Sequence, residues 1–267
     1  MGFPELLKKA SLVGAFFVSA LAVPPALAAC PAPPSSLQPS EVRRVVDGDT
    51  LRLADGRGVR LIGLNAPELG RDGRSAEAFA VAAQRRLQAL VAASDGRVIV
   101  QPGREAKDHY GRTLANVFDS HGRNLEEQLL AEGLGYQVAI APNDRLLLCQ
   151  QAAERTARTA GLGLWRQVSL LAPTQLKSAG FALLRARVSG IERNRGGLWI
   201  ELEGPLVLRI EPKWLDQFDL AALQALVGRQ VEVRGWVVDR ARRGALRPGQ
   251  SRWLMALSHP AMLRAQP

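Results

Sequence analysis

Cysteine and histidine are scarce in this chain. Its 267 residues include two cysteines and three histidines. No histidine or second cysteine stands at metal-ligand spacing from either cysteine, so we expect neither cysteine to bind a metal or to act in catalysis.

Lysine is scarce as well. It occurs only at Lys8, Lys9, Lys107, Lys177 and Lys213. The formal net charge is nevertheless +10, so arginine carries most of the positive charge. This balance favours a polyanionic partner, either nucleic acid or an anionic membrane surface. A GC-rich coding sequence would also raise arginine over lysine, and charge alone therefore does not decide the function.

No apolar run near the start of the chain is long enough to span a membrane readily. Ala10 to Val23 is apolar but short, follows the basic pair Lys8-Lys9 and precedes Ala26-Leu27-Ala28. This arrangement is typical of a secretory signal peptide with an A-x-A cleavage site. We therefore predict a signal peptide at residues 1–28, export to the periplasm or medium, and no integral membrane span in the mature chain.

Cys30 has two alternative fates. Leu27-Ala28-Ala29-Cys30 resembles a lipoprotein box, which would leave Cys30 lipidated and the protein lipid-anchored. In an oxidising compartment, a pair of cysteines is more often a disulfide, here between Cys30 and Cys149. Both alternatives export the protein.

The remaining sequence predicts two folded domains of an α+β protein. Residues 29–40 are expected to form a Pro-rich linker. Residues 41–167 predict a small five-stranded β-barrel of the oligonucleotide/oligosaccharide-binding (OB) type with three helices. After a linker at 168–178, residues 179–267 show three strands, a helix and two strands, the order of a second, smaller OB-like barrel. We expect a monomer.

Local patterns place the elements. The first domain is expected to have strands at 41–46, 50–53, 59–64, 97–101 and 113–118 and helices at 75–93, 124–133 and 143–159. The second is expected to have strands at 183–191, 198–202, 206–210, 231–238 and 253–258 and a helix at 215–227. Asn124 and Glu127 have capping-box spacing at the start of the second helix.

Three motifs in the first domain predict a phosphodiesterase site. They are Asp47-Gly48-Asp49-Thr50, the segment from Arg60 to Asn65-Ala66-Pro67-Glu68, and His109-Tyr110-Gly111-Arg112. Carboxylate and carbonyl oxygens can hold a divalent cation, arginines can bind a phosphate, and a glutamate can accept a proton from water. A proline after Ala66 ends the third strand and would leave Glu68 at the barrel mouth.

These motifs resemble the staphylococcal nuclease (thermonuclease) family. The likeness covers about residues 41–166 and extends through Asp108, Thr113-Leu114 and Gly163-Leu164-Trp165. It implies an OB-type nuclease that hydrolyses DNA, with RNA as a further substrate class, uses Ca²⁺ and leaves 3′-phosphate ends.

The resemblance also implies roles for single residues. It gives Arg60 and Arg112 as phosphate-binding arginines and Glu68 as the general base. It gives Asp49, Asn65 and the backbone carbonyl of Ala66 as metal ligands, with Asp47 nearby and Tyr110 at the substrate phosphate. His109, next to Tyr110, is a further candidate substrate contact, and the alternative is an exposed loop histidine. Asn65 stands where the family usually has an aspartate, which predicts weaker Ca²⁺ binding or another divalent metal.

Two further points bear on the substrate. The family's base-stacking tyrosines would align near Ala139 and Ala141, which are small. Tryptophans of the second domain could form a stacking platform instead, although tryptophans in strands more often lie in a core; they are Trp199, Trp214, Trp236 and Trp253. The alternative function is a weak or inactive nuclease-like module that binds nucleic acid or an envelope partner.

Overall fold

Five strands close the first barrel. In the computed structural model, which describes residues 29–70, 73, 75–168 and 170–266, these strands run in the order β1-β2-β3-β6-β5 around the barrel. Their bounds are β1 Pro39–Val45, β2 Thr50–Leu53, β3 Gly58–Leu61, β5 Arg97–Lys107 and β6 Thr113–Phe118. Alternate apolar side chains such as Leu51, Leu53 and Val59 point into the barrel and are fully buried. The signal peptide predicted for residues 1–28 lies outside the described residues.

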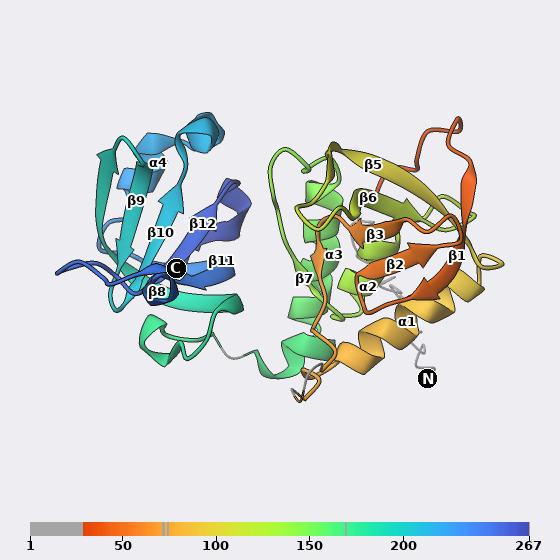
Figure 1. The fold of residues 1–267 in the computed structure, drawn as a ribbon, viewed down its shortest axis with the longest axis horizontal. Helices are drawn as coiled ribbons and strands as arrows, with labels where there is room; N and C mark the ends of the chain where they lie inside the picture. The colour runs from red at the N-terminus through yellow and green to blue at the C-terminus, as the bar shows by residue number, and fades with distance from the viewer. Residues whose placement is uncertain (1–28, 71–72, 74, 169, 267) are drawn as a thin grey trace, which may run out of the picture.

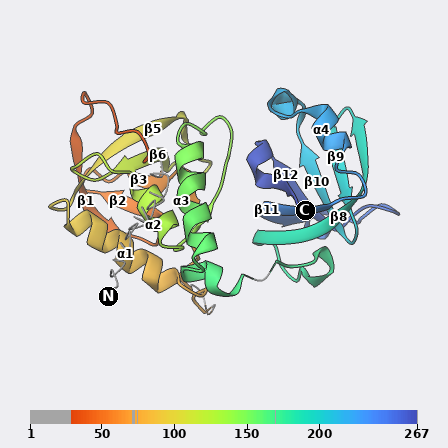
Figure 2. The ribbon, with the colours of Figure 1, turned by 180° about the vertical axis from the view of Figure 1, so that it is seen from behind.

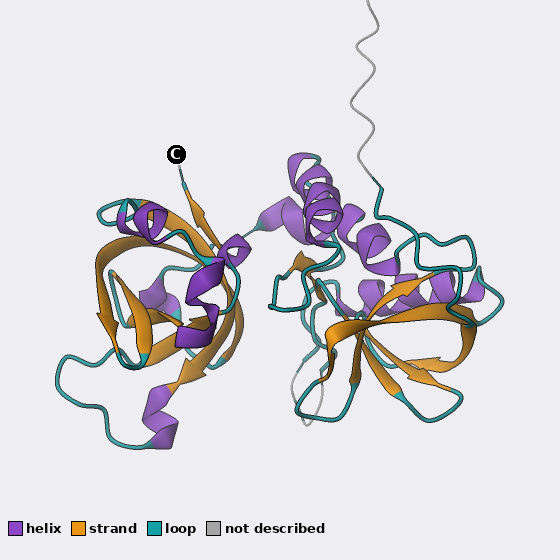
Figure 3. Ribbon diagram, turned by 90° about the horizontal axis from the view of Figure 1, so that it is seen from above, coloured by secondary structure: helices purple, strands orange, loops and turns teal. Residues whose placement is uncertain are grey.

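Three helices pack against this barrel (Figure 3). They are α1 Ala80–Ala92, α2 Leu125–Ala131 and α3 Leu147–Thr159. α3 begins four residues later than expected, because Asn143 bonds with β5: its side chain accepts from the Glu105 N–H at 3.0 Å and donates to the Glu105 carbonyl at 2.9 Å. α1 also begins later than predicted, after Phe79, whose φ is +67°.

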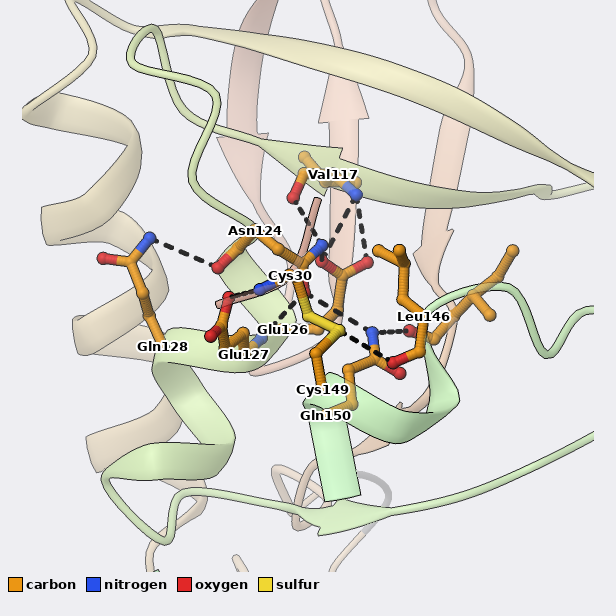
Figure 4. The surroundings of a disulfide bond; sticks show 10 residues. Cys30, Val117, Asn124, Glu126, Glu127, Gln128, Leu146, Cys149 and Gln150 are labelled. Carbon is orange, nitrogen blue, oxygen red and sulfur yellow. Dashed lines mark hydrogen bonds between the residues drawn. A yellow bond between two sulfur atoms is a disulfide. The ribbon is translucent and has the colours of Figure 1, made fainter. Parts of the chain in front are cut away.

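The capping box predicted for α2 is only half formed. Asn124 caps the helix, because its side chain accepts from the Glu127 N–H at 2.9 Å. The Glu127 carboxylate instead accepts from the backbone N–H of Cys30 at 3.0 Å. Figure 4 shows this contact beside the disulfide that joins Cys30 to Cys149 across a sequence separation of 119. A sulfur in a disulfide cannot also carry a lipid.

One predicted strand is divided in two. β3 ends at Leu61, and a separate short strand, β4 Leu64–Asn65, pairs with β7 Tyr136–Gln137. The division occurs at Gly63, whose φ of +84° favours glycine, and a Cβ there would collide with the side chain of Gln150. This turn moves Asn65 out of the barrel wall and toward its mouth.

The second barrel also closes. Its strands are β8 Gly180–Asn194, β9 Gly197–Leu202, β10 Leu206–Ile210, β11 Gln230–Asp239 and β12 Trp253–Leu257, with β13 Leu263–Ala265 added beside β11. Pairing of β12 with both β10 and β11 completes the ring. The predicted α+β plan of two barrels in tandem is therefore confirmed.

The prediction of a single helix at residues 215–227 is wrong. The segment is split into a 3₁₀ turn at Pro212–Gln217 and α4 Leu220–Gln224. The division follows from Asp219, whose carboxylate accepts from the backbone N–H groups of Ala221 and Ala222 and so starts a new helix.

The outer face of β11 faces the first domain, and Figures 1 and 2 show β11 on the side of the second barrel toward α3. Arg234 donates to both carboxylate oxygens of Glu154 on α3, at 2.7 and 2.8 Å. Glu232 accepts from both terminal nitrogens of Arg158, at 2.8 and 2.7 Å. Two charged pairs, largely removed from water, therefore fix β11 against α3.

Small residues let the barrels approach each other. Val138 and Ala139 are buried within the core cluster of the second barrel. The backbone N–H of Ala141 donates to the hydroxyl of Ser258 at 3.2 Å. Ala139 and Ala141 are therefore covered by the second barrel and offer no surface for a nucleobase.

Within the described part of the chain, no helix combines the length and apolar character needed to cross a membrane.

Candidate active site

A cavity of about 1120 Å³ lies at the mouth of the first barrel. It brings together eight of the predicted site residues, namely Asp47, Asp49, Arg60, Asn65, Glu68, His109, Tyr110 and Arg112. Ala66 is buried beside the cavity and does not line it. The second barrel contributes Trp236 to the lining.

The turn between β1 and β2 places Asp49 under the cavity. Gly48 is required there because a Cβ would lie 2.6 Å from the Cβ atoms of both Ala66 and Ala83. The Asp49 carboxylate accepts from the Thr50 hydroxyl at 3.1 Å and from the Ala66 N–H at 2.8 Å. Asp49 is held in one orientation by these bonds.

Burial dominates the electrostatics of Asp49. Removal from water raises its pKa to about 6, a shift that Arg60 opposes and the nearby charge of Asp47 increases. Nη2 of Arg60 lies 3.0 Å from the Asp49 carboxylate. A further positive charge nearby would stabilise the ionised form of this buried carboxylate.

Arg60 projects from β3, and both terminal nitrogens of its guanidinium group make polar contacts. Its Nη1 donates to the carbonyls of Leu61 and Leu64, at 2.9 and 2.8 Å. Its Nη2 contacts Asp49 and also donates to Oδ1 of Asn65 at 3.3 Å. These contacts hold the guanidinium plane at the cavity wall.

The oxygens of Asp49 and Asn65 converge on one point, the Nη2 atom of Arg60. One carboxylate and one amide oxygen are the donors that a hard cation such as Ca²⁺ takes. The described residues contain no cluster of three or more His, Cys, Asp or Glu suited to a metal. One carboxylate and one neutral amide oxygen suit a hard cation, but they supply few protein ligands and a low negative charge.

Glu68 stands exposed at the cavity rim just after β4. Its backbone is held by Glu77: the Glu68 N–H donates to the Glu77 carboxylate at 3.0 Å, and the Glu77 N–H donates to the Glu68 carbonyl at 3.0 Å. Exposure keeps the carboxylate in contact with water, which a proton acceptor needs.

Arg112 reaches the cavity from the turn before β6. Asp108 holds it through a 2.7 Å contact with Nε. Burial opposes ionisation of Asp108, but hydrogen bonds from Arg112 and Tyr110 outweigh it and lower the pKa. The Arg112 guanidinium lies over the ring of Tyr110, 5.3 Å from its centre, and the His109 ring contacts the same ring at a tilt of 42°.

Several residues around the site were not assigned roles by sequence reasoning. Thr50 and Asp108 were visible within the motifs, and the i,i+4 spacing of Asp108 and Arg112 could have indicated their pairing. Glu77 and the position of Trp236 could not be inferred, because both depend on contacts made only in the folded chain. Trp253, by contrast, is buried in the second barrel's core.

Comparison with known proteins gives three findings. The family profile described as "Staphylococcal nuclease homologue" matches residues 58–167. Thermonuclease of Staphylococcus intermedius is 33% identical over 129 residues, which span 47% of this chain and 75% of that protein. Endonuclease YhcR of Bacillus subtilis is 32% identical over 150 residues, which span 51% of this chain and only 12% of that protein.

Proposed function

The chain belongs to the staphylococcal nuclease family, and on that premise we propose that it is an exported, Ca²⁺-dependent nuclease that hydrolyses phosphodiester bonds of DNA, with RNA as a further candidate substrate. The observation that carries the proposal is the single cavity that gathers Arg60, Arg112, Glu68 and the oxygens of Asp49 and Asn65. The disulfide supports export, because such bonds persist in oxidising compartments.

Two arginines would bind the scissile phosphate. Water attack builds negative charge on the phosphoryl oxygens, and guanidinium groups fixed in advance oppose that charge where it develops. Arg112 is oriented by its Nε contact with Asp108, so its terminal nitrogens can serve the phosphate. Arg60 would exchange its contacts with Asp49 and Asn65 for a phosphate oxygen.

Glu68 would accept the proton of the attacking water. Its side chain is exposed at the rim while its backbone is fixed by Glu77. General-base catalysis of this kind contributes typically ~10²–10⁴-fold to the rate. The product would carry a 3′-phosphate end.

Asp49, Asn65 and the backbone carbonyl of Ala66 would hold the cation, with Asp47 nearby. When bound, Ca²⁺ supplies positive charge that offsets the charge developing on the phosphoryl oxygens. Asn65 provides no negative charge, so we expect weaker Ca²⁺ binding than a site with two carboxylates would give.

The test is direct. Mature protein is incubated with linear DNA in CaCl₂ or in EDTA, and the products are extended by a polymerase before and after removal of 3′ phosphates. We expect cleavage only with Ca²⁺ and extension only after phosphate removal. Absence of metal-dependent cleavage at high protein concentration would contradict the proposal and would favour the nucleic-acid-binding alternative, which Asn65 supports.

A further inference from the structure

One strand of the second barrel continues from the domain interface into the cavity. Side chains at Glu232, Arg234 and Trp236 share the outer face of β11, because successive strand residues alternate between faces. Glu232 and Arg234 are buried against α3. Trp236, two residues further, lines the cavity and keeps 38% of its surface exposed.

Contacts with the first domain fix the position of Trp236. Arg234 donates to the Gln137 carbonyl at 3.0 Å in addition to its contact with Glu154. The indole of Trp236 meets Phe181 edge-on, with ring centres 5.3 Å apart. An exposed aromatic residue that belongs to the second barrel is thus anchored through its own strand to the first domain.

A chain of rings and strand pairs connects Trp236 with the catalytic side of the cavity. Phe181 stacks on Tyr136 at 5.4 Å between ring centres. Tyr136 is paired with Asn65 in the β4–β7 ladder. The same short ladder therefore supports an oxygen donor of the site and the aromatic contact that positions the second barrel.

The cavity offers an aromatic face from each barrel. Tyr110 is 73% exposed and lies against Arg112, the expected phosphate ligand. Trp236 comes from the other barrel and has no arginine among its ring contacts within the described part of the chain. Any unpaired base can stack on the face of a tryptophan ring, because every base has a π-face.

We propose that Trp236 is the base-binding residue of the cavity, so that the second barrel completes a subsite for an unpaired nucleobase beside the scissile phosphate. The inference rests on the proposed nuclease function and names its substrate class, single-stranded nucleic acid. In a duplex, the bases are stacked on their neighbours and cannot use this face. A phosphate backbone without bases would bind through the arginines alone.

The test measures binding without cleavage. Glu68→Gln protein is titrated with a fluorescein-labelled single-stranded oligonucleotide and with an abasic oligonucleotide of equal length, and fluorescence anisotropy gives the two affinities. Trp236→Ala in this background should weaken binding of the base-containing oligonucleotide by roughly 5- to 150-fold, the equivalent of one stacked base. Binding of the abasic oligonucleotide should change little.

Two matched variants control for packing. Trp236→Phe keeps an aromatic face and should retain most of the preference for bases. Trp199→Ala removes a half-buried tryptophan on β9 that does not line the cavity, and it should leave both affinities unchanged. Circular dichroism and thermal unfolding establish that each variant is folded.

Distinct results overturn the two claims. Equal loss for both oligonucleotides, or no loss for either, in a folded Trp236→Ala protein would refute base stacking. Failure of the Glu68-containing protein to cleave DNA in Ca²⁺ would refute the nuclease function, while the preference for bases would still be measured in the binding assay.

Discussion

Replacement of Arg234 by Met should loosen the second barrel from the first. Both side chains of the Arg234–Glu154 pair are more than nine-tenths buried, at 9% and 8% exposure. Removal of one partner of a buried ion pair costs about 3–5 kcal/mol, because the other charge stays buried without compensation. Among the described residues, Glu154 would keep its hydrogen bond from the Gln137 N–H, at 2.7 Å, and the more distant charge of Arg158.

The expected loss lies near the lower end of that range. Glu232, the second acidic partner of Arg234, keeps both bonds from Arg158. We therefore expect Arg234→Met to lower the free energy of unfolding by about 3 kcal/mol, and Glu154→Gln in the same chain to restore most of it, because a neutral pair carries no buried charge.

Urea unfolding followed by tryptophan fluorescence is the assay, since all tryptophans except Trp165 lie in the second barrel. Arg229→Met, an exposed arginine just before β11, is the matched control and should change stability by no more than about 0.5 kcal/mol. If Arg234→Met is as stable as this control, the pair does not hold the barrels together and the reasoning is refuted. Because Trp236 follows on the same strand, Arg234→Met should also reduce the preference for base-containing oligonucleotides.

Three further predictions concern the metal, the disulfide and a buried acid. Asn65→Asp adds a negative charge at the cation donors and should tighten Ca²⁺ binding by roughly tenfold or more in calorimetry; activity gained only by this variant would favour the binding-module alternative. Reduction of Cys30–Cys149, which closes a separation of 119, should cost about 4–5 kcal/mol of stability if chain entropy dominates, and an unchanged urea midpoint would argue against that. Burial raises the pKa of Glu126 from 4.5 to about 8, so between these values the folded state holds a proton that the unfolded state releases. Stability should then fall with rising pH by up to about 1.4 kcal/mol per unit from Glu126 alone. The fall should be shallower in Glu126→Gln, in which Asp49 with its pKa of about 6 still contributes at the acid end, whereas parallel pH curves would contradict the shift.

The barrel plan could be predicted because alternating apolar residues and turn signals are local features. The site motifs were also local, and each brings its own side chains to the barrel mouth. Sequence reasoning placed one continuous strand where Gly63 divides it and one helix where Asp219 starts a second. In both cases a single residue's conformation or cap outweighed the hydrophobic pattern.

The contribution of the second barrel could not be predicted. The outer face of β11 reads in sequence as an ordinary solvent face with Glu232, Arg234 and an isolated tryptophan. Its partners on α3 are 74 and 80 residues away in the chain. Ala139 and Ala141 are small because the docked second barrel covers them, and this contact depends on the folded chain.

The most direct test of the central claim compares wild-type protein with Glu68→Gln under single-turnover conditions, with DNA in excess Ca²⁺. We predict a loss of roughly 10²–10⁴-fold in the cleavage rate constant, with the fold retained, because the backbone contacts of position 68 with Glu77 remain. Equal cleavage rates for the two proteins would contradict the assignment of this cavity as the site of hydrolysis.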